Sequence, residues 1–343
     1  MNFKSDNTAA VCPEIIQALI EANAGHQPSY AEDIFTKKLQ LLVNEIFETK
    51  TKIFFANTGT AANSLALSAI IPPHGAVFCH TEAHIQTNEC NAPEFFTDGA
   101  KLLLIEGKHG KISPKELEKA VHYTLSMRPL AAEPSALSVT QSTEQGSVYT
   151  LDEIKELTKI AHDHHMLVHM DGARFTNGLV SLNASPAEIT WRSGVDVLCL
   201  SGTKNGAMIA EMIVFFNQKL CEEFDYHCKR AGQLASKSRY IAAQFLGLFK
   251  NDLWLKNAAH ANQMAKELEK AFKRSAVKII HPVEANEVFV SMSKSLADHL
   301  HKNNVKFSSW GFEENNAYRF VASWMTEIKE ITNLESAIQN FKS

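Results

Sequence analysis

Short apolar runs alternate with amphipathic segments over the first two thirds of the chain. In the amphipathic segments the apolar residues recur at helical spacing, as with Ile15, Ile16 and Leu19 after Pro13. Strands and helices that alternate in this way predict an α/β fold with a mostly parallel sheet covered by helices. The expected strands span residues 52–56, 76–80, 101–105, 136–141, 166–170, 195–200 and 208–216.

The pattern changes after residue 216. Long helical segments extend to about residue 275, and short strands interleaved with helices follow at 277–281, 286–292 and 318–323. This change predicts a smaller α+β domain at the C-terminus. We place the boundary near residue 250, which gives a large domain over 1–250, including an N-terminal arm, and a small domain over 251–343.

Composition narrows the class of protein. The chain has 343 residues, of which 45% are hydrophobic and 21% charged, and this is typical of a globular protein with room for two cores. A net charge of −4 and the lack of basic runs argue against a nucleic-acid partner. We also expect no membrane partner, because the apolar stretches are too short to cross a bilayer. Six cysteines without a CxxC pair, and no signal peptide, favour a cytoplasmic protein.

Two of the predicted strands end in charged side chains. VHMDGARF (168–175) delivers Asp171 and Arg174, and VLCLSGTKNG (197–206) delivers Lys204 in a glycine-flanked turn. An acid, a guanidinium and a lysine at strand ends suit a pyridoxal phosphate (PLP) site. The lysine amine would form a Schiff base with PLP, and the carboxylate would keep the pyridine nitrogen protonated. From the residues alone, an ion pair beside a solvated lysine remains the alternative.

Two further segments could serve such a site. NTGTAAN (57–63) turns from a strand into a helix, so the backbone N–H groups of Gly59 and Thr60 could hold a phosphate. The turn lacks the GK[ST] ending of a P-loop, which argues against nucleotide hydrolysis. His84 follows a strand and could stack on a cofactor ring and titrate near neutrality, although a packed histidine is the common alternative.

Other polar clusters have simpler explanations beside functional ones. HDHH (162–165) is not expected to bind a metal, because consecutive side chains at a helix end diverge. KRAGQLASKSRY (229–240) is either a solvated helix face or a source of charge, from Lys237 and Arg239, for the phosphate in a neighbouring subunit. Arg319 lies within an apolar strand and needs a partner, for which a substrate carboxylate is suitable.

Sequence blocks spread over nearly the whole chain resemble the low-specificity L-threonine aldolase family, a branch of the aspartate aminotransferase-type (fold type I) PLP enzymes. DGAR followed by the lysine block is a specific pairing. The matching blocks are SDNTA (5–9), QPSYAEDIFT (27–36), NTGTAAN (57–63), HTEAHI (80–85), VTQSTEQGSVYT (139–150), VHMDGARF (168–175), SGTKNGA (201–207), SKSRY (236–240) and YRFVASW (318–324).

The resemblance implies roles in cofactor binding. Lys204 would carry PLP as a Schiff base, and Asp171 would pair with the pyridine nitrogen. His84 would stack on the ring, and either His84 or a bound water is the candidate base. Gly59 and Thr60 would bind the phosphate. These three side chains, Lys204, Asp171 and His84, would form the catalytic set. No metal is implied.

The resemblance also implies a substrate site and an assembly. Arg174 would lie near the ring hydroxyl and the substrate carboxylate, with Ser5 and Arg319 completing the carboxylate site and Tyr30 at its mouth. Arg239, with Lys237 nearby, would reach the phosphate in a neighbouring subunit. The family's homotetramer, built as a dimer of dimers, would follow.

One block departs from the family pattern. Many relatives have a histidine near the substrate hydroxyl, in a block that reads TQSTE here, so that Thr143 corresponds to that histidine. Threonine cannot act as a base at neutral pH, which leaves the base and the preference between threonine and allo-threonine open.

The activity implied is cleavage of L-threonine, L-allo-threonine and related β-hydroxy-α-amino acids to glycine and an aldehyde. Two alternatives stay open at this stage. A PLP-dependent β-eliminating lyase or aminotransferase would use the same lysine and acid. A non-catalytic PLP- or metal-binding protein that descends from such an enzyme would give no product from any β-hydroxy amino acid.

Overall fold

The computed structural model describes residues 1–311 and 316–341, and within them a seven-stranded sheet forms the larger part of the molecule. Its strands lie in the order β1-β7-β6-β5-β4-β2-β3. β7 runs antiparallel to both of its neighbours, and the other neighbouring strands pair in parallel. The strands are β1 (Lys52–Ala56), β2 (Gly75–His80), β3 (Lys101–Ile105), β4 (Glu133–Thr140), β5 (Leu167–Gly172), β6 (Val197–Ser201) and β7 (Glu211–Phe215).

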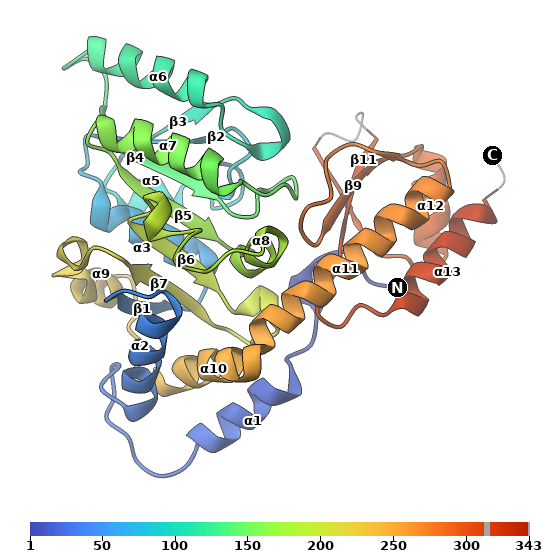
Figure 1. The fold of residues 1–343 in the computed structure, drawn as a ribbon, viewed down its shortest axis with the longest axis horizontal. Coiled ribbons are helices and arrows are strands. Elements are labelled where there is room, and N and C mark those ends of the chain that lie inside the picture. The colour runs from blue at the N-terminus through green and yellow to red at the C-terminus, as the bar shows by residue number, and fades with distance from the viewer. Residues whose placement is uncertain (312–315, 342–343) are drawn as a thin grey trace.

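Helices cover both faces of this sheet, which confirms the predicted α/β class (Figure 1). Those of the large part are α1 (Pro13–Ala22), α2 (Ile34–Ile46), α3 (Gly59–Ile70), α4 (His84–Thr87), α5 (Ala92–Phe96), α6 (Pro114–Ser126), α7 (Leu151–Asp163), α8 (Phe175–Leu182), α9 (Phe224–Arg230) and α10 (Arg239–Phe249). The long helix α11 (Leu253–Arg274) crosses from the large sheet towards the C-terminal part, where α12 (Lys294–Lys302) and α13 (Ile328–Gln339) lie.

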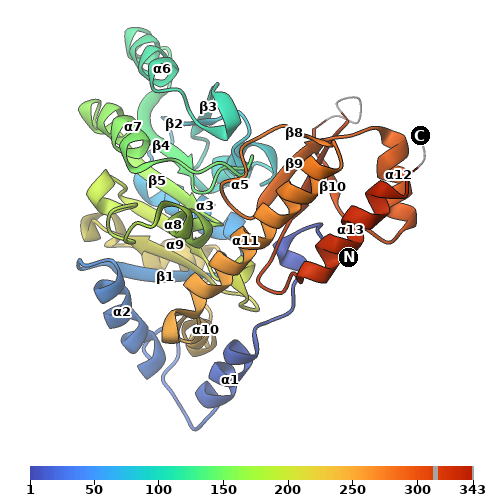
Figure 2. The same cartoon turned by 45° about the vertical axis from the view of Figure 1, so that its right-hand side comes forward.

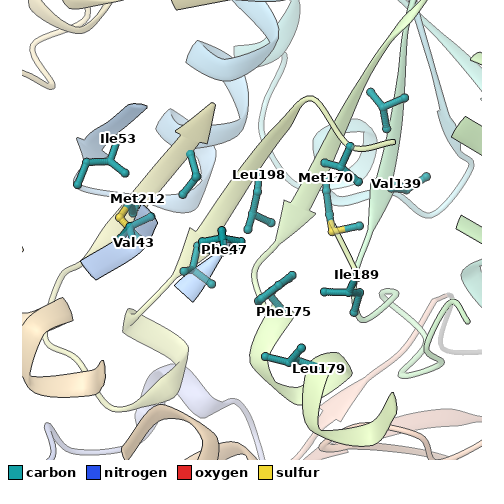
Figure 3. Close-up of a cluster of buried hydrophobic side chains, with 14 of the residues drawn as sticks. Val43, Phe47, Ile53, Val139, Met170, Phe175, Leu179, Ile189, Leu198 and Met212 are labelled. Carbon is teal, nitrogen blue, oxygen red and sulfur yellow. The ribbon is translucent and has the colours of Figure 1, made fainter. Parts of the chain in front are cut away.

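Alternation along the central strands builds two cores. On β6, Leu198 and Leu200 face one core, whereas Val197 and Cys199 face the other, because successive side chains of a strand point to opposite faces. Figure 3 shows the first core, in which Leu198 and Phe175 lie among side chains from neighbouring strands and helices. Burial on both faces explains why these strands read as continuous apolar runs in the sequence.

A four-stranded antiparallel sheet forms the C-terminal part of the described residues, in the order β10-β11-β9-β8. Its strands are β8 (Lys278–Ile279), β9 (Glu287–Ser291), β10 (Ser308–Ser309) and β11 (Ala317–Val321). The N-terminus joins this part, since Asn2 bridges to Lys306 and Phe3 is buried in its core. The division of the chain near residue 250 stays a prediction.

Most observed strand boundaries differ from the predicted ones by one to three residues, and β4 begins at Glu133, three residues before the predicted start at 136. β7 begins at Glu211 and not at residue 208, because Met208 and Ile209 lie exposed in the preceding loop. The short strand β10 was not predicted, since two serines carry no apolar pattern. Within the described part of the chain, no helix is both long and apolar enough to cross a membrane.

Candidate active site

A cavity of about 310 Å³ lies at the carboxyl edge of the large sheet. Parallel strands β4, β5 and β6 end there, and antiparallel β7 begins there, so their terminal residues meet at one edge. The lining residues are Asn7, Asn57, Thr58, Gly59, Thr60, Asn63, His84, Glu89, Thr140, Ser142, Glu144, Asp171, Ala173, Arg174, Cys199, Ser201, Thr203, Lys204 and Glu211.

Asp171 and Lys204 come into this cavity from neighbouring strands. Asp171, which is 4% exposed, accepts hydrogen bonds from Asn63 Nδ2 at 2.9 Å and from the Ala173 N–H at 2.9 Å. Burial by itself would raise the pKa of Asp171, but the charges of His84 and Lys204 outweigh it and lower that pKa. Asp171 is therefore an anion at neutral pH.

Lys204 sits in a single helical turn, Thr203–Asn205, directly after β6. Its backbone N–H donates to Ser201 Oγ at 3.4 Å. Glu211 starts β7 opposite Ser201, whose Oγ donates to Glu211 Oε1 at 3.1 Å. Burial raises the pKa of Glu211 to about 7, against the opposing effects of Thr203 and of the Lys204 charge. The lysine turn thus faces a buried carboxyl group that changes charge near neutral pH.

His84 begins the short helix α4 and is tied to Glu89. His84 Nδ1 lies 2.8 Å from Glu89 Oε1, and Asn63 Nδ2 donates to the same oxygen at 2.9 Å. The hydrogen bond to Glu89 raises the pKa of His84, and burial raises the pKa of Glu89. His84 and Glu89 thus form one hydrogen-bonded pair in which the pKa of each group lies above its usual value. Asn63 joins the pair to Asp171.

Glu144, in the loop after β4, brings a further carboxyl group to the cavity. Thr140 Oγ1 donates to Glu144 Oε1 at 2.8 Å, and the His84 N–H donates to it at 2.9 Å. The other oxygen, Oε2, is shielded from solvent and has no hydrogen-bond partner among the described residues. Burial, followed by the negative charge of Asp171, raises the pKa of Glu144 to about 7. The neighbouring Thr143 points elsewhere, since its Oγ1 donates to the His109 carbonyl at 3.0 Å.

The start of α3 forms one wall of the cavity. Thr58 caps the helix by accepting the Ala61 N–H at 3.1 Å. Gly59 and Thr60 follow in the first turn and line the cavity, and Asn57 lines it just before the helix. A twelve-residue helix presents free N–H groups and the positive end of its dipole here, which suits a phosphate.

The two predicted carboxylate-binding arginines belong to a buried ion network. Arg174 donates from Nε and Nη2 to Asp6 at 2.8 and 3.1 Å, and its Nη1 lies 3.4 Å from Glu287 Oε1. Arg319 Nη1 lies 3.5 Å from the same oxygen, and Arg319 Nε has no partner among the described residues. Arg174 lines the cavity, whereas Arg319 is linked to it through Glu287.

Four other predicted residues lie outside the cavity lining. Ser5 Oγ accepts the Asn7 N–H at 3.2 Å, next to Asp6. Tyr30 is 48% exposed, with the Lys229 ammonium 5.1 Å from its ring centroid. Arg239 Nη1 donates to the Gly25 carbonyl at 3.0 Å, and Lys237 is exposed.

The histidine cluster at the end of α7 is dispersed. His162 Nε2 lies 3.2 Å from Asp196 Oδ2, and His164 packs against the ring of His122. In residues 1–311 and 316–341, no group of three or more His, Cys, Asp or Glu side chains is arranged to hold a metal ion.

Several cavity residues were not singled out from the sequence. Asn63 lies one turn into the helix that starts at Gly59, a spacing that puts both on one face and could have signalled it. Glu89 and Glu144 carry no local signal, because their places depend on how loops return to the same edge of the sheet. Glu211 does carry one, since it is a charge within the apolar run 208–216.

Comparisons with known proteins agree with this geometry. The model of the family described as "Beta-eliminating lyase" matches residues 2–295. A low specificity L-threonine aldolase of Pseudomonas aeruginosa is 42% identical over 98% of this chain and 96% of its own length. A solved threonine aldolase of Leishmania major has a TM-score of 0.92 at 24% identity, covering 98% of each chain. An aspartate aminotransferase of Thermotoga maritima has a TM-score of 0.75 at 13% identity, covering 99% and 91%.

Proposed function

The chain belongs to the beta-eliminating lyase family and, within it, to the low-specificity L-threonine aldolases, and from this we propose its reaction. It is a lyase that cleaves L-threonine, L-allo-threonine and related β-hydroxy-α-amino acids to glycine and an aldehyde, acetaldehyde for these two substrates. The observation that carries this proposal is the convergence of Lys204, Asp171 and the start of α3 on one cavity.

The cofactor of this family is PLP, and the cavity residues fit it. The α3 N-terminus, with Gly59 and Thr60, suits the phosphate, and the Lys204 amine suits covalent attachment. Asp171 accepts two hydrogen bonds and has capacity for a third, so it can hold a protonated pyridine nitrogen. His84 is the residue that we assign to the face of the ring. When bound, PLP supplies a sink for the electron pair released at Cα.

The protein side chains orient the substrate. Arg174 Nη1 is only loosely held by Glu287, so it can turn to a substrate carboxylate, with Arg319 and Ser5 supporting that site. Fixing the carboxylate sets which bond at Cα stands perpendicular to the cofactor ring, and cleavage requires that this bond be Cα–Cβ. Tyr30 is assigned to the mouth of the site.

A product analysis tests the reaction. Purified protein loaded with PLP is given L-threonine and then L-allo-threonine, and we expect glycine and acetaldehyde in equal amounts. The family model also names β-elimination, and that reaction would instead release ammonia and a 2-oxo acid. A 2-oxo acid with ammonia, or no product from any β-hydroxy amino acid, would contradict the aldolase assignment.

The active unit that we propose is a homotetramer with sites shared between subunits. Arg239 and Lys237 lie outside the cavity of their own chain, which is consistent with service to a neighbour's phosphate. Ile20, Ile34 and Leu41 on α1 and α2 are exposed, close to a hollow of about 1190 Å³. These exposed apolar side chains support subunit contact, and Figure 2 shows α1 and α2, which carry them, at the lower end of the molecule. The six free cysteines support a reducing, cytoplasmic location.

A further inference from the structure

Cleavage of a β-hydroxy amino acid needs a group that takes the hydroxyl proton, and Thr143 cannot supply it. The side chain of Thr143 is fully buried, and its Oγ1 contacts the His109 carbonyl and Ser147 Oγ. His84 is poorly suited as well, because its Nδ1 is engaged with Glu89 Oε1 at 2.8 Å and this hydrogen bond raises the pKa of the ring. The base must therefore be sought among the other residues of the cavity.

Glu144 has the geometry of such a group. Two donors, Thr140 Oγ1 and the His84 N–H, fix its Oε1 as an acceptor at 2.8 and 2.9 Å. Oε2 is left without a partner, so it is the oxygen that gains or loses the proton. A carboxyl group with one oxygen clamped and one free is held in position and still able to accept. Its carbon skeleton lines the same cavity as Lys204.

We propose that the Glu144 carboxylate takes the proton from the β-hydroxyl of the substrate. This inference rests on the aldolase function proposed above and names the catalytic residue that it lacks. The O–H electron pair becomes the second bond of the aldehyde C=O, and the Cα–Cβ bond breaks with its electron pair left on Cα. A proton is then delivered to Cα to give glycine, and Glu144 releases its own to solvent. No proton is gained or lost overall.

The charge on Glu144 sets a pH dependence. Its carboxylate form predominates above its pKa of about 7, so cleavage should fall as the pH drops through 7. Around Glu144, burial raises the pKa values of Cys79, to about 12, and of Tyr149, so both stay neutral there. Asp171 stays charged, since its pKa is lowered, and the hydrogen bond to Glu89 raises the pKa of His84.

Glu211 complicates the wild-type profile. Burial raises its pKa to about 7 as well, so two groups of the cavity titrate in the same range. The loss of activity at low pH, the acid limb of the pH profile, must therefore be assigned to one of the two groups with a variant. Glu144→Gln keeps the size of the side chain and its acceptor oxygen for Thr140 and His84, and removes only the titrating site.

The test compares two reactions of the PLP-loaded protein. We expect Glu144→Gln to lower kcat for threonine cleavage about 100-fold or more, with KM changed less than kcat. Exchange of the glycine α-proton with deuterium needs no hydroxyl base, so its rate should stay within about threefold of the wild-type rate. The visible spectrum of bound PLP should be unchanged. The remaining cleavage should lose its acid limb near pH 7. Glu118→Gln, an exposed glutamate on α6, is the matched control and should retain both reactions.

Either of two results would overturn the proposal: cleavage by Glu144→Gln within threefold of wild type, or an equal loss of cleavage and glycine exchange. A wild-type protein that makes no aldehyde would instead refute the aldolase function.

If Glu144→Gln fails to fold, Thr140→Val decides. It removes one hydrogen bond that lowers the pKa of Glu144, so the acid limb should move to higher pH, and an unmoved limb would reject the role. Infrared titration of the carboxyl C=O band gives the same shift without turnover.

Discussion

Buried carboxyl groups at one edge of the sheet differ in charge because their immediate surroundings differ. Asp171 receives an amide and a backbone N–H and lies near two cations, so its pKa is lowered despite burial. Neither Glu144 nor Glu211 forms an ion pair with a cation among the described residues, and burial raises the pKa of each to about 7. One group can thus serve as a permanent anion while others exchange protons at neutral pH.

Replacing Lys204 with alanine tests the residue on which cofactor attachment depends. We expect the visible absorbance of covalently held PLP to disappear and turnover to fall by roughly a thousandfold or more. Borohydride reduction of the wild-type protein followed by peptide mapping should label Lys204. Lys219→Ala, at an exposed lysine after β7, should behave as wild type. Label on a different side chain would disprove the assignment of Lys204.

A second substitution tests His84. His84→Asn removes the ring proposed to cover the cofactor and breaks the 2.8 Å contact with Glu89, so we expect a fall in turnover of about 10- to 100-fold with PLP still bound. Steady-state kinetics and the PLP spectrum measure this. His74→Asn is a matched control, because His74 forms a 3.1 Å pair with Glu133 on the exposed surface. Unchanged kinetics in His84→Asn would remove it from the catalytic set.

At the scale of elements, the turns after the strands place the reactive side chains. The turn after β6 carries Lys204 and closes at Gly206, whose φ of +103° is unfavourable for residues with a side chain. A Cβ added there would overlap Cys12 Sγ and come within 3.1 Å of Asn257 Nδ2. The turn that carries Lys204 therefore packs tightly against Cys12 of the N-terminal segment and Asn257 of α11.

Gly206→Ala should for these reasons destabilise the fold and disturb the site together. We expect a loss of roughly 3 kcal/mol in the free energy of unfolding, from backbone strain plus overpacking, with weaker PLP binding. Denaturant unfolding at fixed protein and PLP concentrations measures it. Gly232→Ala separates the two causes, since Gly232 also has a positive φ, +70°, but open space around it, and should cost about 1 kcal/mol. Equal losses in both variants would argue against the overlap with Cys12.

The sequence predicted the central strands and the strand-end residues well, for a physical reason. Buried parallel strands such as β5 and β6 are mostly apolar, so a charge at their ends, as at Asp171, stands out locally. Glu144 and Glu89 were missed because they lie in loops that carry no period, and only tertiary packing brings them to the cavity. The pairing of Arg174 Nε and Nη2 with Asp6 was missed for the same reason.

At the scale of the whole molecule, both ends of the chain converge on one network. Asp6, near the N-terminus, binds Arg174 of the large sheet and Asn286 before β9, and Glu287 joins Arg174 to Arg319 on β11. The N-terminal segment also pairs with the small sheet. A shift of the small sheet would thus change the position of Arg174, the cavity side chain that we assign to the substrate carboxylate.

Shared active sites predict that two inactive variants restore activity when mixed. Lys204→Ala destroys its own site, whereas Arg239→Ala would impair the site of the neighbour. In a mixed dimer one site therefore carries both changes and the other carries neither. Random reassociation of equal amounts makes half of the dimers mixed, so about a quarter of wild-type activity should return.

The Arg239 side chain contacts only the Gly25 carbonyl and Tyr240 among the described residues, and its loss should leave the fold intact. The two variants are denatured and refolded together under conditions in which the wild-type protein recovers its activity. A mixture that stays inactive would mean that Arg239 acts in the active site of its own subunit, and this would contradict shared sites.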